Sequence, residues 1–213
     1  MDRDDVSNIL PIIRDVMLSG LTVSPLGKML LPGESVNDFI IPLNKCGIAT
    51  VCSITVDGIL LKHGIPVKPR FGGLVEVKDG NPVRFTDLVR YDSTTIDPLE
   101  ILMSQSLTSV SDMLTIGSGK ILANLREITM NARDRVEETL DELIAAGFSG
   151  ILEVGEPNTD ILGVSVERDH FGVVVVGGTN PMAVAQEQGF RIDTHAMSSL
   201  MEVSDMVPID QLI

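Results

Sequence analysis

Aromatic residues and cysteine are scarce in this sequence, and each shortage excludes a class of protein. There is no tryptophan and one tyrosine, and aromatic residues make up 3% of the 213 residues. Proteins that hold single-stranded nucleic acid commonly stack bases on aromatic rings, so that binding mode is disfavoured. The two cysteines, Cys46 and Cys52, are too few for a disulfide framework, which favours a reducing, cytoplasmic location.

Basic residues and long apolar runs are also lacking. Lys and Arg number 16 against 30 Asp and Glu, giving a formal net charge of −14. Phosphate contacts supply most non-specific DNA affinity, so we expect no direct nucleic-acid binding by this chain. No run of eighteen apolar residues occurs, so we expect no membrane span. The acidic, polar first residues do not read as a secretory or transit signal, which agrees with a cytoplasmic location.

Motifs for metal or covalent chemistry are missing as well. His63, His170 and His195 stand apart, with no HExxH motif or paired cysteines beside them. No Gly-x-Ser-x-Gly nucleophile motif is present. We therefore expect no metal site, no cofactor and no enzyme activity.

The sequence does contain a β-rich stretch, residues 46–77, around which the rest is organised. Apolar runs at residues 48–56 and 59–61 flank Asp57-Gly58, a dipeptide typical of tight hairpins. A third run follows Arg70-Phe71-Gly72-Gly73. Three strands joined by tight turns are predicted here.

A weaker copy of this pattern occupies residues 146–178, about a hundred residues later. Gly147 aligns with Gly47, and Phe171-Gly172 aligns with Phe71-Gly72. Chance alignment of common glycines and valines is the alternative to duplication. The predicted fold class is α/β: a mixed-sheet domain with two pseudo-repeated β-rich lobes and flanking helices. No Pro-rich, Ser-rich or charged linker divides the chain, so residues 1–213 are expected to form one domain.

Helices are predicted outside the two lobes. Residues 4–19 have helical spacing of apolar residues, with Pro11 marking either a later start or a kink. Asp97-Pro98 is a helix-start signal, and a helix is also expected over residues 109–114. Asn131 is expected to cap a further helix with a buried stripe formed by Ala132, Val136, Leu140, Leu143 and Ile144. Three prolines in residues 21–45 predict short, irregular edge strands.

Two glycine-rich turns are candidates for anion binding. Gly117-Ser118-Gly119-Lys120 resembles half of a phosphate loop, but its spacing is wrong and a strand, not a helix, is expected next. An ordinary glycine turn is the better interpretation. The Gly177-Gly178-Thr179-Asn180-Pro181 segment joins a strand to a helix start, whose free N–H groups suit a carboxylate. The alternative is a simple turn with Asn180 as the helix cap.

Two arginines are the remaining candidates. Arg70 precedes Phe71-Gly72-Gly73, so a bidentate cation stands next to glycines that allow close approach of a ligand. Arg126 lies within an expected strand and shares a face with Leu122 and Asn124. A structural ion pair is the alternative for both arginines. Cys52 is expected to pack in the core.

Several motifs together resemble the effector domain of NrpR, the nitrogen-regulatory repressor family of methanogenic and related archaea. They are GIATVCSITVDGILLKHGIPV, RFGGLVEVKDGNPVRF, TTIDPLEI, GKILANLREI, ILEVGEPNTDILGV and HFGVVVVGGTNP. They occur in one order over essentially the whole chain. The family's repressors bind operator DNA through a winged helix, which these residues lack.

The resemblance implies 2-oxoglutarate as the effector ligand and a winged-helix repressor as the partner, in a homodimer or a hetero-oligomer. Residues suited to a small dicarboxylate with a keto group are Arg70, Arg126, Thr50, Cys52, Ser118, Gly177, Gly178, Thr179 and Asn180. Two alternatives stay open. One is a structural or dimerisation subunit without a ligand, and the other is an enzyme acting on a small keto acid.

Overall fold

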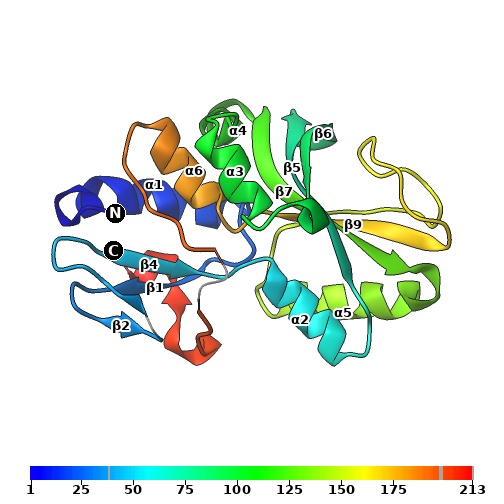
Figure 1. The fold of residues 1–213 in the computed structure, drawn as a ribbon, viewed down its shortest axis with the longest axis horizontal. Coiled ribbons are helices and arrows are strands. Elements are labelled where there is room, and N and C mark those ends of the chain that lie inside the picture. The colour runs from blue at the N-terminus through cyan, green and yellow to red at the C-terminus, as the bar shows by residue number, and fades with distance from the viewer. Residues whose placement is uncertain (38, 197–198, 213) are drawn as a thin grey trace.

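The computed structural model describes residues 1–37, 39–196 and 199–212 (Figure 1). The chain is of the α/β class, as the sequence predicts. The helices are α1 (Val6–Leu18), α2 (Ile54–Lys62), α3 (Pro98–Ser104), α4 (Val110–Ile116), α5 (Arg133–Ala145) and α6 (Asn180–Glu187). The strands are β1 (Leu26–Leu30), β2 (Ser35–Val36), β3 (Phe39–Ile40), β4 (Gly47–Thr50), β5 (Lys68–Lys78), β6 (Asn81–Arg90), β7 (Gly119–Thr129), β8 (Ile151–Val154), β9 (His170–Val176) and β10 (Val207–Pro208). None of these helices is long and apolar enough to cross a bilayer.

The larger sheet has five strands in the order β6-β5-β7-β9-β8, and all its neighbours run antiparallel. The central strands β7 and β9 are buried over most of their lengths, and the apolar run Val173–Val176 lies in β9 with every side chain covered. On one face, Ile128, Phe171, Val173 and Val175 pack with α2 and α5. Figure 1 shows these two helices below the sheet.

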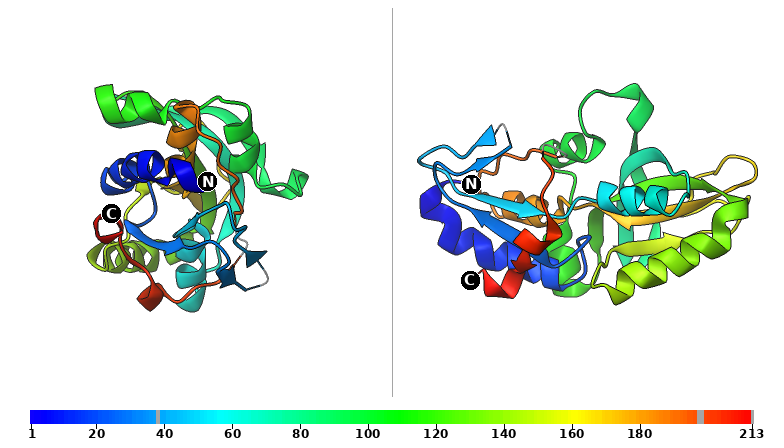
Figure 2. Two further views of the ribbon diagram at one scale, coloured as in Figure 1. Left: turned by 90° about the vertical axis from the view of Figure 1, so that its left-hand side faces the viewer. Right: turned by 90° about the horizontal axis from the view of Figure 1, so that it is seen from below.

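A smaller sheet has the order β10-β1-β4, again antiparallel. Apolar residues of α1 and α6 form one core cluster with Met29 and Ile48 of this sheet. Both chain ends lie in this half, at the opposite end of the molecule from α5 (Figure 2). The prediction of edge strands in residues 21–45 is wrong for β1, which is central. Pro25 and Pro32 stand outside the strand, so the backbone N–H groups of β1 remain free to pair on both sides.

The predicted hairpin at Asp57-Gly58 is wrong, because both residues lie inside α2. A two-residue type I′ turn needs positive φ at both central positions, and neither residue has it. Val56 and Leu60, four residues apart, are fully buried against the sheet. Burial of one helical face therefore decides the conformation of this short apolar run.

The remaining helices agree with the prediction in position more than in detail. Helix α1 runs through Pro11 without a later start. The Asp97 carboxylate accepts the N–H groups of Leu99 and Glu100, which confirms it as the cap of α3. Helix α5 begins one residue later than expected, because Met130–Ala132 form a 3-10 turn and Ala132 takes the cap position instead of Asn131. Its Ile144 is 54% exposed rather than buried.

The two segments proposed as pseudo-repeats share some features and differ in others. Phe71-Gly72 and Phe171-Gly172 lie in β5 and β9, which pair with β7 on its two sides. Residues 46–77, however, contain α2, whereas residues 155–169 connect β8 to β9 without a helix. The duplication stays a prediction.

Candidate functional site

Two connections cross between the halves of the molecule and meet at one place. Strand β4 leaves the small sheet and leads through residues 51–53 into α2, which lies on the large sheet (Figure 1). Strand β9 leaves the large sheet and leads through Gly177–Thr179 into α6. The two turns touch, because a Cβ on Gly178 would lie 2.8 Å from the Val51 carbonyl oxygen and 3.4 Å from the Cys52 Cα. Only glycine allows this approach.

Beneath the two turns lies a buried polar cluster on the central strand β7. Asn124 and Arg126 are 1% and 3% exposed, and alternation of side chains along a strand puts both on the face covered by α2. The Asn124 amide donates to Ser53 Oγ over 3.1 Å, and Arg126 Nε donates to the Asp57 carboxylate. The Arg126 Nη1 also donates to the Asn124 carbonyl oxygen over 3.4 Å. Two polar contacts therefore tie α2 to β7.

The edge of this cluster is formed by Tyr91 and by the start of α3. The Tyr91 hydroxyl donates to Asn124 Oδ1 over 2.5 Å. Burial, followed by the nearby Asp97 carboxylate, raises the pKa of Tyr91 above its usual value, so the phenol stays protonated and able to donate. Gly72 lies opposite Asn124 in the sheet, and a Cβ there would lie 2.5 Å from the Pro98 Cβ. The first turn of α3 is therefore close to Asn124.

We call this region the junction site: Thr50, Cys52, Ser53, Asp57, Tyr91, Asn124, Arg126 and the Gly177–Asn180 turn. It brings together seven of the nine residues that the sequence singled out. The reasoning from sequence missed Ser53, Asp57, Tyr91 and Asn124 as members. For Asn124 a signal was present, because an amide within an apolar strand and on the same face as an arginine needs a polar partner.

Two members of the junction site differ from expectation. Thr179, not Asn180, caps α6, and the Asn180 side chain is fully buried. The Asn180 amide pairs with the backbone N–H and carbonyl of Leu122 at 2.8 and 3.0 Å, so it fastens α6 to β7. Cys52 is only partly buried, whereas Cys46 is the cysteine packed in the core.

Arg70 lies on the opposite face of the large sheet. Its guanidinium donates to the buried Glu127 carboxylate and, over 3.0 Å, to Glu167. Because Glu127 directly follows Arg126 in β7, their side chains point to opposite faces. Arg70 and Arg126 therefore do not face one common cleft. The contacts of Arg70 support the alternative of a structural ion pair, and its ligand role stays a prediction.

Arg70→Ala separates the two interpretations of Arg70. From its contacts we expect the variant to lose about 3 kcal/mol of unfolding free energy, because the Glu127 carboxylate is left buried without its cation. Arg70→Lys keeps the charge and should recover part of this loss, because one nitrogen of Arg70, Nη1, makes both of its carboxylate contacts. Thermal melts together with calorimetric titration test this. A roughly ten- to a hundredfold loss of 2-oxoglutarate affinity in folded Arg70→Ala would instead place Arg70 in the ligand site.

Ser118 is also separate from the junction site. It precedes β7, and its hydroxyl accepts the Asp79 N–H over 3.0 Å in the neighbouring hairpin turn. Eight residues separate it from Arg126, roughly 26 Å along an extended strand. The structure confirms the ordinary glycine turn at Gly117–Lys120, because Gly117 ends α4 with φ +71° and a strand follows.

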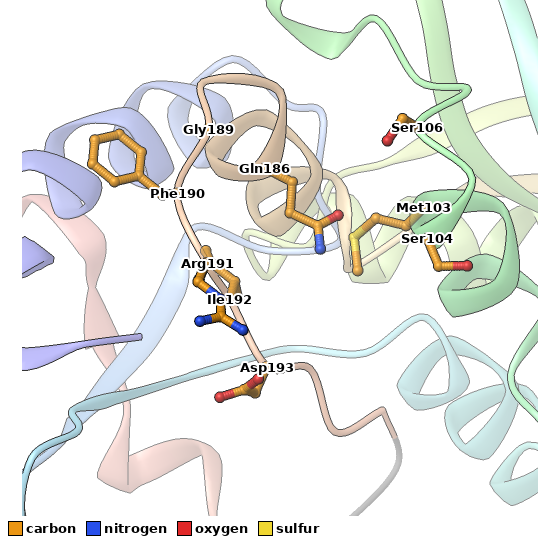
Figure 3. Close-up of a pocket in the computed structure, with 9 residues that line it drawn as sticks. All are labelled: Met103, Ser104, Ser106, Gln186, Gly189, Phe190, Arg191, Ile192 and Asp193. Atoms are coloured by element: carbon orange, nitrogen blue, oxygen red, sulfur yellow. The ribbon is translucent and has the colours of Figure 1, made fainter.

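An open pocket of about 330 Å³ lies elsewhere, between the ends of α3 and α6 (Figure 3). Gln186 and Met103 lie close together at one side of it, and Arg191 and Asp193 line the connection that follows α6 (Figure 3). Both helices end here, and helix C-termini carry partial negative charge, which opposes binding of a dianion. Within the described ranges, no group of three His, Cys, Asp or Glu side chains is placed to hold a metal ion.

The structure is thus an α/β fold in which two crossing connections lie over a buried polar cluster. The chain belongs to the NrpR family: the family model described as NrpR regulatory domains NRD1 and 2 matches residues 1–208. A nitrogen repressor-like protein from Methanococcus jannaschii has a similar crystal structure. Its TM-score is 0.81 at 28% identity, covering 98% of this chain and 84% of that one.

Two curated relatives are named as regulators, not as enzymes. The global nitrogen regulator NrpRI of Methanosarcina mazei is 38% identical over 208 residues. The global nitrogen regulator NrpR of Methanococcus maripaludis is 34% identical over 163 residues. The aligned regions span 64% and 28% of these two relatives, so the relatives are considerably longer than the matched part.

Proposed function

We propose that this chain is the metabolite-sensing part of a nitrogen-regulatory transcriptional repressor and that its effector is 2-oxoglutarate. Family membership over residues 1–208 carries this proposal. The relatives' names support nitrogen regulation. The ligand itself comes from the resemblance of the sequence motifs to the NrpR effector domain.

We propose the junction site as the place of binding. A dicarboxylate with a keto group needs a cation and neutral hydrogen-bond donors. Arg126 supplies the cation, and Asn124, Ser53 and Tyr91 supply polar groups. Gly177 and Gly178 let the crossing turns pack closely over this cluster. Thr50, Cys52 and Thr179 border the same turns.

Calorimetric titration of the pure chain with 2-oxoglutarate, citrate and glutamate tests this function. We expect 2-oxoglutarate to bind more tightly than the other two acids. Binding of none of them by folded chain would favour a structural subunit, and turnover of 2-oxoglutarate would favour an enzyme. Either result would contradict the proposal.

We further propose that the signal passes to a winged-helix repressor subunit or domain, and that the chain itself makes no DNA contact. The net charge of −14 supports the second point. A two-fold dimer would suit a palindromic operator. Sedimentation at micromolar concentration and gel retardation of an operator duplex at physiological salt test these two points. A monomer, or salt-sensitive DNA binding, would count against them.

A further inference from the structure

The carboxylate of Asp57 holds the position on Arg126 that a ligand carboxylate would need. Both side chains are buried, at 6% exposed for Asp57 and 3% for Arg126. Asp57 Oδ1 accepts from Nε, which is one of the two donors on the side edge of the guanidinium. A second carboxylate can form the paired contact on that edge only where Asp57 gives way.

We propose that Asp57 is an internal competitor of the ligand: a carboxylate of the effector displaces Asp57 from Arg126, and this exchange releases the first turn of α2. The inference rests on the proposed function, because it requires a dicarboxylate that binds at Arg126. It goes further by assigning Asp57 to the control of affinity and α2 to the transmission of the signal.

The position of α2 allows this exchange to affect the other half of the molecule. Helix α2 is tied to β7 by the Asp57–Arg126 pair and by the 3.1 Å bond between Ser53 and Asn124. A displaced carboxylate cannot stay buried without a cation, so α2 has to shift until Asp57 reaches water. Residues 51–53 join α2 directly to β4 of the small sheet. A shift of α2 therefore pulls on the half of the molecule that contains α1 and both chain ends.

The far end of β5, where Glu76 pairs with Lys120 at the start of β7, supplies a comparison within the same chain. Glu76 pairs with Arg84 over 3.0 Å, but the Arg84 side chain is 64% exposed and the pair joins two strands of one hairpin. The second cation that pairs with Glu76, Lys78, is also largely exposed, at 62%. Loss of the Glu76 charge should leave the junction site unchanged.

The test compares Asp57→Asn with Glu76→Gln in calorimetric titrations with 2-oxoglutarate, below the melting temperatures of all proteins. We expect Asp57→Asn to bind about tenfold more tightly than wild type, because the competing charge is gone while the shape is kept. Glu76→Gln should keep the wild-type affinity. Equal or weaker binding by folded Asp57→Asn, with binding by wild type intact, would overturn this inference and leave the proposed function standing.

A measurement on the unaltered chain covers the case in which Asp57→Asn does not fold. Amide hydrogen exchange is followed in α2 and, as an internal reference, in α5, with and without saturating 2-oxoglutarate. We expect faster exchange in the first turn of α2 with ligand and no increase in α5. Slower or unchanged exchange in α2 would overturn the inference. Failure of the folded wild-type chain to bind would instead contradict the proposed function itself.

Discussion

Arg126→Met is expected to lower the free energy of unfolding by about 3–5 kcal/mol and to abolish measurable binding of 2-oxoglutarate. The loss of stability follows because the Asp57 carboxylate would remain buried without its cation. The loss of binding follows because Arg126 is the only cation among the residues that define the junction site. Denaturant unfolding and calorimetric titration measure the two effects.

The two effects of Arg126→Met can be separated by replacing its partner as well. Exchanging a buried ion pair for apolar residues of similar size is often neutral or stabilising. The double variant Arg126→Met with Asp57→Leu should therefore regain most of the stability and still fail to bind. Wild-type affinity in either folded variant would remove Arg126 from the ligand site.

Gly178→Ala is expected to disturb the contact between the two crossing turns. The new Cβ would lie 2.8 Å from the Val51 carbonyl oxygen, and because this is a backbone atom the turns have to separate. Such overpacking costs about 1–3 kcal/mol of stability. Displacement of Cys52 and Ser53 from their positions should weaken the binding of 2-oxoglutarate by about tenfold, which equals about 1.4 kcal/mol of binding free energy.

Gly58→Ala is the matched control for Gly178→Ala. Gly58 lies within α2, and a Cβ there would meet no atom within 4 Å. Alanine in a helix interior is favoured over glycine by up to about 1 kcal/mol, so this variant should gain stability. Because its Cβ meets no neighbouring atom, its ligand affinity should fall by much less than that of Gly178→Ala. Equal losses of affinity in both glycine variants would show that the close approach at Gly178 has no special role.

Strands and helices with strong local signals could be predicted from the sequence. The apolar run of β9 and the Asp97-Pro98 start of α3 agree with the structure. Helix α2 could not be predicted, because a short apolar run around Asp57-Gly58 is compatible with both a strand pair and a helix. What decides it is tertiary: Val56 and Leu60 are buried against the large sheet, and Asp57 pairs with Arg126, 69 residues away.

The candidate site could be predicted by residue type but not by arrangement. Seven of the nine predicted residues meet at the junction site because the connections after β4 and β9 cross between the two halves. This crossing depends on long-range strand pairing. The separation of Arg70 from Arg126 has two causes. Glu127 and Arg126 point to opposite faces of β7, and a bulge between Pro69 and Phe71 lets Arg70 reach Glu127. Nothing local in the sequence indicates which of the 30 acidic residues each arginine meets.

A crystal structure of the chain grown with 2-oxoglutarate is the most direct test of the junction site as the effector site. We expect one ligand carboxylate within hydrogen-bond distance of the Arg126 guanidinium and the Asp57 carboxylate moved away from it. A ligand bound to Arg70 on the other face of the sheet, or in the pocket beside Arg191, would show that the junction site is not the effector site.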